Sequence, residues 1–247
     1  MTSPTPHIAA NASLKHPSLK HPSLKHHGPP LWLLAILYTI LFNAGLAPVT
    51  AFGGLPYWPG PWESPAVITT FFQTQTTRVL ACLLLQTGAV VCLGLFTAVI
   101  VSRLQFLGIR AAGVTIALFG GFLCVFDSMA ASFTTWTLIR PAVAANPPIL
   151  VTLNYLSYAF GGPGFSIPMG LLMAGVSISA GLTKLLPKWI MILGLLLAAC
   201  GELSVFHLIS PQLLFLIPLV RFPSFIWIIA VAFALPRYRK EAPLAAG

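Results

Sequence analysis

The hydrophobic positions of this chain form six long runs, which are separated by short stretches rich in proline, glycine and charged residues. The runs cover residues 31–51, 79–101, 111–135, 165–182, 189–208 and 211–235. A helix of about 20 apolar residues crosses the hydrocarbon layer of a membrane, and backbone groups in lipid must find their partners within the segment. The pattern therefore predicts an all-α membrane bundle of about six transmembrane helices.

Local signals mark where several helices begin or break. Ser64-Pro65 and Ser210-Pro211 both place a capping residue before a proline that suits the first helical turn. The first of these signals predicts a helix that starts well before the apolar run at 79–101 and is polar on one side at first. Residues 149–160 indicate another half-exposed helix, and the glycine-rich break at 161–164 separates it from the fourth run.

The chain divides into a tail at 1–30, a six-span bundle at 31–236 and a short tail at 237–247. Ser-Leu-Lys-His-Pro occurs at 13–17 and again at 18–22, and a variant follows at 23–27. A repeat of this composition has no means of forming a core, so we expect the first tail to be disordered. Its histidines could bind a metal and its lysines could attract anionic lipid; these residues are His16, His21, His26, His27, Lys15, Lys20 and Lys25. Their spacing matches no regular set of metal ligands, which favours a solvated basic tail.

The first span has a second interpretation, as a signal peptide that is cleaved after Val49-Thr50-Ala51. A leader of thirty residues is long for that role, and five more spans follow it. We therefore expect the first span to remain in the protein.

The composition supports a membrane protein and excludes a soluble one. Only 7% of the residues are charged and 57% are hydrophobic, whereas soluble domains carry roughly 25% charged residues. The net charge of +9 is spread over the ends of the segments, so no basic face for nucleic acid results. No C-x-x-C pair is present, and no pattern specifies a cofactor, a metal site or an oligomeric state.

The distribution of basic residues predicts the orientation. Ten of the thirteen Lys and Arg residues lie in the two tails and in the second and fourth loops, and the other three are Arg78, Arg140 and Arg221. Because basic loops stay in the cytoplasm, both termini are expected there.

Small residues recur at spacings of three and four along the third, fourth and fifth spans. Membrane helices approach one another closely along such stripes. The stripes include Gly113, Ala117 and Gly120 in the third span, Gly170, Ala174 and Ser177 in the fourth, and Gly194 and Ala198 in the fifth. They lead to Asp127 and Glu202, so both carboxylates are predicted on packing faces.

Three ionisable residues lie inside the spans, namely Asp127, Glu202 and Arg221. Each would cost about 2.5–3.5 kcal/mol in lipid alone, and such residues are candidates for function. Counting along each helix places them in one layer in the outer half of the membrane. We therefore predict an ion pair between Arg221 and Glu202, with Asp127 as a second partner or protonated.

Ser166 and His207 are expected near the same outer edge, with Arg78 and Arg140 as further outer-side candidates. In span number the chain is similar to the rhomboid intramembrane proteases, which use a serine and a histidine. Their G-x-S-G motif has glycine where Ile167 stands, and their histidine follows two spans after the serine. An intramembrane hydrolase is accordingly the least favoured of three hypotheses.

Residues 165–235 resemble a group of bacterial six-span membrane proteins of unknown function. The likeness is carried by FSIPMGLLMAGVSI, LLPKWIMILGLLLAACGE and RFPSFIWIIAVAF. It implies a multi-pass protein of the bacterial inner membrane, and it identifies no catalytic residues in this chain.

The favoured hypothesis is a non-enzymatic protein in the lipid bilayer, acting as a small-molecule or proton-linked transporter or sensor. The alternative is a structural or partner-binding membrane subunit, in which the buried charges only lock the bundle. A polar cavity open to one side favours the first hypothesis, and a dry, fully paired cluster favours the second.

Overall fold

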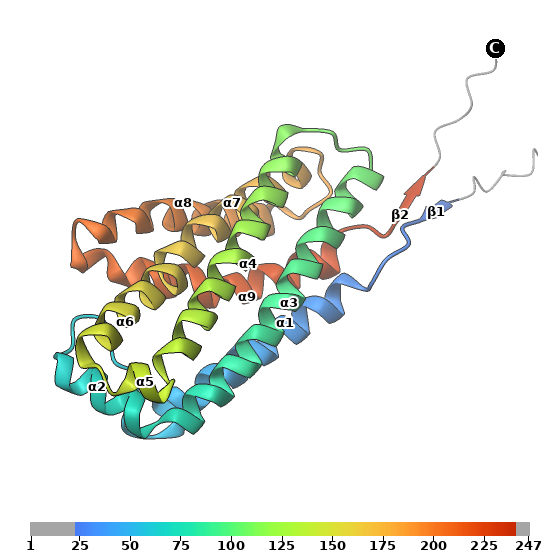
Figure 1. The fold of residues 1–247 in the computed structure, drawn as a ribbon. Coiled ribbons are helices and arrows are strands. Elements are labelled where there is room, and N and C mark those ends of the chain that lie inside the picture. Colours follow the sequence, from blue (N-terminus) through green and yellow to red (C-terminus); the bar gives the residue numbers. More distant parts are fainter. Residues whose placement is uncertain (1–22, 241–247) are drawn as a thin grey trace, which may run out of the picture.

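The computed structural model describes residues 23–240 and is a bundle of long helices (Figure 1). The elements in chain order are β1 (Ser23–Lys25), α1 (Leu31–Leu46), the 3-10 helices η1 (Ala47–Val49) and η2 (Ala51–Gly53), α2 (Pro65–Thr74), α3 (Thr76–Phe106), α4 (Ala112–Leu138), α5 (Pro141–Ala144), α6 (Pro147–Gly161), α7 (Pro163–Leu182), α8 (Lys188–Leu203), the 3-10 helices η3 (Ser204–Leu208) and η4 (Pro211–Phe215), α9 (Leu216–Ala234) and β2 (Tyr238–Lys240). Within this part of the chain, six helical segments are long and apolar enough to span a membrane. The predicted all-α, six-span membrane protein is confirmed.

The fourth span joins two α-helices, and the second span is preceded by a separate short helix, α2. α2 begins at Pro65 with Ser64 as its cap, since the Ser64 hydroxyl accepts a bond from the Val67 amide at 3.4 Å. α2 ends before Gln75, where α3 starts in a new direction. α6 and α7 are likewise separated at Gly162, yet together they form the fourth candidate span. That span therefore starts earlier than residue 165, where the hydropathy pattern placed it.

The six spans bring the two ends of the described chain to one end of the bundle, where β1 pairs with β2 (Figure 1). α2 and α5 lie at the opposite end. We call these the terminal end and the loop end.

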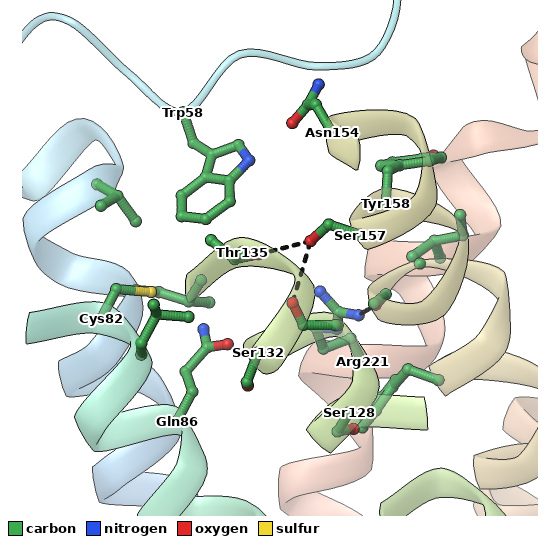
Figure 2. A pocket seen from close by; sticks show the side chains of 18 of the residues that line it. Trp58, Cys82, Gln86, Ser128, Ser132, Thr135, Asn154, Ser157, Tyr158 and Arg221 are labelled. Carbon is green, nitrogen blue, oxygen red and sulfur yellow. Dashed lines mark hydrogen bonds between the residues drawn. The ribbon is translucent and has the colours of Figure 1, made fainter. Parts of the chain in front are cut away.

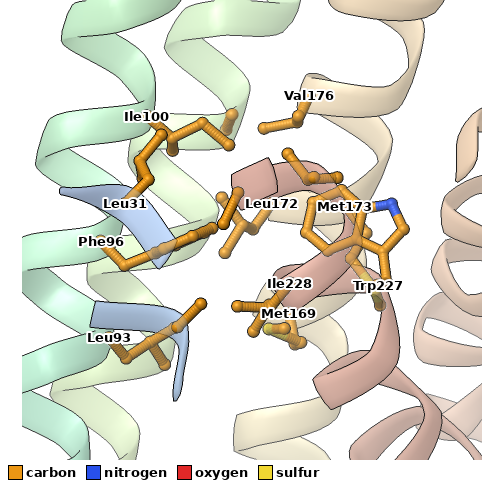
Figure 3. Packing of buried hydrophobic residues seen from close by; sticks show 14 of the residues in the cluster. Leu31, Leu93, Phe96, Ile100, Met169, Leu172, Met173, Val176, Trp227 and Ile228 are labelled. Carbon is orange, nitrogen blue, oxygen red and sulfur yellow. The ribbon is translucent and has the colours of Figure 1, made fainter. Parts of the chain in front are cut away.

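The main hydrophobic core fills the half of the bundle nearer the terminal end. Side chains from α1, α3, α7 and α9 interlock there, including Leu31, Phe96, Ile100, Leu172 and Trp227 (Figure 3). These five are almost completely buried. A second, smaller core joins α2, the start of α3 and α6 at the loop end.

The predicted small-residue stripes form close helix contacts. A Cβ atom on Gly175 of α7 would lie 2.3 Å from the Gly113 carbonyl oxygen of α4, and one on Gly120 would lie 2.7 Å from the Pro168 carbonyl oxygen. Gly201 of α8 faces Gly170 of α7 in the same way. α7 is therefore held between α4 and α8 by backbone-to-backbone approach, which is how membrane helices gain packing energy.

The predicted disorder of residues 1–30 is wrong for the last part of that tail. Ser23–Lys25 pairs antiparallel with Tyr238–Lys240, and the His26 amide donates to the Arg237 carbonyl at 3.0 Å. The His26 ring is buried, lies 3.1 Å from the Ser102 hydroxyl and packs against Phe106. Residues of the third repeat are therefore ordered by contacts with the C-terminal strand and with the end of α3, which the composition of the tail does not reveal. The first two repeats, with His16 and His21, lie outside the described residues.

Candidate functional site

A cavity of about 310 Å³ lies within the loop-end half of the bundle (Figure 2). Its walls come from α1, α3, α4, α6 and α9, from the first turn of α7 and from the loop before α2. The fifth span, α8, contributes no lining residue. The cavity is therefore bounded by five spans, and the main core closes it toward the terminal end.

One wall of the cavity is polar and is built by α4 and α6. Ser128, Ser132 and Thr135 follow one another along α4 at helical spacing, opposite Asn154 and Ser157 of α6. The Thr135 and Ser157 hydroxyls are 2.6 Å apart, and Ser157 also donates to the Ala131 carbonyl at 3.3 Å. These bonds hold α6 against α4. Gln86 of α3 faces this wall across the cavity.

The loop between α1 and α2 covers the cavity with aromatic side chains. Trp58 is half-buried and packs edge-on against Phe72, while Trp62 is largely exposed and contacts the Tyr158 ring. Arg78 holds the start of this loop by donating to the Gly54 and Leu55 carbonyls at 3.3 and 3.5 Å. The predicted outer-side residue Arg78 thus positions the cover of the cavity and does not line it.

Arg221 of α9 is the one charged residue among those that line the cavity. Its Nη2 donates to the Gly161 carbonyl, and its guanidinium lies 4.7 Å from the Phe165 ring centroid and 5.6 Å from that of Phe42. The Gly161 carbonyl is free to accept because α6 ends there. The Nε atom is buried and has no hydrogen-bond partner in the described chain.

The predicted ion pair between Arg221 and Glu202 does not form. No carboxylate in the described part of the chain lies within ion-pair distance of Arg221. Glu202 has an exposed side chain at the edge of the α7–α8 contact, against Gly170, whereas Asp127 lies against Gly164. Gly164 and Gly170 are about 9 Å apart along α7 at the rise of an α-helix, so the two carboxylates do not share a layer.

The serine and histidine proposed for hydrolysis do not meet either. Ser166 is fully buried and donates to the Gly162 carbonyl at 3.1 Å, whereas the His207 ring packs against Tyr158. No hydrogen bond joins them in residues 23–240. Arg140 stacks over Trp136 at 4.3 Å, outside the cavity.

The sequence reasoning identified Arg221 but missed the polar wall. Two signals in the chain could have indicated it. Ser128, Ser132 and Thr135 share one helical face, adjacent to the stripe of small residues, and Asn154 and Ser157 share another. Isolated serine and threonine residues are common in membrane helices because their hydroxyls bond to the preceding turn. Such residues therefore do not by themselves indicate a site.

Comparison with protein-family models, with curated proteins and with solved structures finds no match to this chain. The site must therefore be interpreted from its own chemistry. A partly apolar cavity with a few converging polar groups is the usual form of a small-molecule site. The cavity offers hydrogen bonds, aromatic surface and one positive charge, and its lining includes no carboxylate that could act as an acid or base.

Proposed function

We propose that this protein binds a small molecule in the cavity at the loop end and acts as a transporter or sensor for it. The observation that carries the proposal is the cavity itself, which places polar groups and one arginine inside the membrane-spanning bundle. Burying polar groups in a membrane costs free energy unless they form hydrogen bonds or ion pairs. Ionisable residues at such positions are therefore candidates for function. A purely structural subunit would gain more from a packed interior here.

The arrangement of core and cavity suggests how a transporter would work. The packed core between the cavity and the terminal end would have to open for a ligand to pass, so in a transporter this arrangement would be the state closed on that side. For a sensor, ligand binding would instead shift α6 and α9 against α4. Both modes require binding first, so binding is the property to test.

We further propose that the terminal end lies in the cytoplasm, in agreement with the position of ten of the thirteen Lys and Arg residues. In that orientation the cavity lies near the outer surface. The likeness of residues 165–235 to bacterial six-span proteins supports the inner membrane of a bacterium as the location.

Binding can be tested by the melting temperature of the purified protein in neutral detergent, measured with fractions of a small-molecule cell extract. A ligand at about ten times its Kd adds about 1.4 kcal/mol to the free energy of unfolding, which raises the melting temperature by a few degrees. Ser132→Leu, which fills the cavity, is expected to abolish this shift. Ile192→Leu on the exposed face of α8 is the control and should retain it. The proposal fails if no fraction stabilises the wild type, or if Ser132→Leu responds equally.

A further inference from the structure

We propose that the ligand is a small organic anion, whose acidic group binds Arg221 and whose uncharged part packs against the aromatic side of the cavity. This inference rests on the proposed function and specifies the ligand class for the same site. Four features of the cavity support it.

The first feature is the lack of a counter-ion. Arg221 carries its charge at every physiological pH, because a guanidinium does not lose its proton in proteins. Within residues 23–240 its one hydrogen-bond acceptor is the Gly161 carbonyl, and neither Nε nor Nη1 forms a bond. A buried cation that is only partly satisfied is costly. An anionic ligand would supply the missing charge.

The second feature is the nature of the other unpaired polar atoms. Among the residues that line the cavity, the buried atoms without partners are Arg221 Nε, Asn154 Nδ2 and the Tyr158 hydroxyl. Two of these are donors only, and the hydroxyl can donate. A ligand rich in acceptors, such as a carboxylate, fits this set.

The third feature is the aromatic surface beside the arginine. The Phe42 and Phe165 rings lie beside the guanidinium, and Trp58 covers the cavity from the loop. Such rings would favour a cationic ligand if the site were otherwise neutral. Here Arg221 already occupies their faces, so a second cation would meet its repulsion. The remaining ring surface is available for the apolar part of an anion.

The fourth feature is size. A cavity of about 310 Å³ is at the lower limit of small-molecule sites, which range from roughly 300 to 1,000 Å³. One acidic group with a body of about one ring is a suitable match. A larger anion would have to displace Trp58.

The charge preference can be measured with thiol reagents of matched size. In a variant without the four native cysteines, Ser132→Cys places a thiol on the cavity wall, and Ala145→Cys places one on the exposed loop at the same end. Each is treated in neutral detergent with the anionic sulfonatoethyl and the cationic trimethylammonioethyl methanethiosulfonate. At each introduced cysteine, the rate with the anionic reagent is divided by the rate with the cationic one. This ratio is then divided by the same ratio for a free thiol in solution.

At Ser132→Cys the anionic reagent is expected to be favoured at least about tenfold, because charges interact far more strongly in a partly desolvated site than in water. Ala145→Cys should show a preference of less than about threefold, since exposed charges are screened. Adding Arg221→Gln should abolish the preference at residue 132, whereas Arg221→Lys, which retains the charge, should keep most of it. Comparison of Ser132→Cys with Ala145→Cys, both with Arg221 intact, tests the charge preference even if Arg221→Gln does not fold.

The outcomes distinguish failure of the anion inference from failure of the proposed small-molecule binding. Reaction at residue 132 with no preference, or with preference for the cation, overturns the anion inference and leaves an accessible cavity. A preference that persists in a folded Arg221→Gln variant also overturns it, since the charge would then lie elsewhere. No reaction at residue 132 with either reagent, while residue 145 reacts, shows that the cavity is closed to water and contradicts the proposed function as well.

Discussion

Arg221 illustrates how a single residue in a membrane helix is stabilised by parts of the chain that lie far away in sequence. Its partners are a carbonyl released at the end of α6 and two rings from α1 and α7. Glu202, which looked like the natural counter-ion, lies against a different part of α7. The charge is thus tolerated through a helix end and aromatic faces, in the manner of other irregular sites in membrane proteins.

This geometry predicts that Glu202 and Arg221 are energetically independent. A double-mutant cycle with Glu202→Gln and Arg221→Gln, followed by unfolding in mixed micelles, should give a coupling free energy below about 0.5 kcal/mol, as for residues without shared partners. Removing one member of a buried ion pair costs about 3–5 kcal/mol. A coupling free energy above about 1.5 kcal/mol would therefore contradict this prediction, and would show that the two side chains form an ion pair in the membrane.

At the scale of elements, the position of α7 is determined by glycines that permit backbone contact. Gly175 lies against the Gly113 carbonyl and the Ala117 amide of α4, where an added Cβ would come within 2.3 and 2.7 Å of backbone atoms. Backbone atoms cannot rotate away as a flexible side chain can. Separation of the two helices is the only way to relieve such a clash.

Gly175→Ala is therefore expected to lower the free energy of unfolding by about 2 kcal/mol, the usual cost of overpacking. Gly88→Ala in α3 is a matched control, because its Cβ would lie 3.6 Å from Leu41 Cδ1, an ordinary contact. It should change stability by less than about 0.5 kcal/mol. Equal effects of the two substitutions in the same unfolding assay would show that the α4–α7 contact is looser than described.

The docking of β1 should depend on pH through His26. Burial lowers the pKa of His26 below its usual 6.5, and Arg103, Arg237 and His27 lower it further. The undocked histidine binds a proton more tightly than the docked one, so docking is complete above pH 6.5 and weakens as the pH falls from there toward the lowered pKa. Hydrogen exchange of residues 23–27 should accordingly increase between pH 7 and pH 5.

His26→Gln is the control for this prediction, because glutamine can bond to Ser102 without titrating. Its exchange in the same segment should be nearly independent of pH after correction for the intrinsic rate. A persistent pH dependence in this variant would assign the effect to another group.

At the scale of the whole molecule, the even number of spans and the β1–β2 pair place both ends of the described chain on one side. The loop end and its cavity lie on the other side. The orientation proposed above rests on the excess of Lys and Arg at the terminal end.

Reporter fusions test this topology. A domain that is active only outside the cytoplasm should work when it is fused after Gly60 or Ala145, and should be silent after Leu107, Leu186 or Gly247. The reverse pattern would show that the bundle is inverted. Activity after both Gly60 and Gly247 would require an odd number of spans and would contradict the six-span bundle.

The sequence by itself determined that the chain spans a membrane, that it is helical and roughly where each span lies. The hydropathy of a segment, and the need of its backbone groups to form hydrogen bonds within it, are local properties. It also indicated the faces of α4, α7 and α8 that pack, since small residues repeat at the helical period.

Only the tertiary structure decided which side chains share a site. Each residue turns a helix by about 100°, so a small error in where a span begins or how it tilts moves a side chain to another neighbour. That is why Arg221 faces Phe165 and the end of α6, and Glu202 does not. The polar wall of the cavity arises for the same reason, from hydroxyls on α4 and α6 that become neighbours only when Gly162 ends one helix and allows the next to begin.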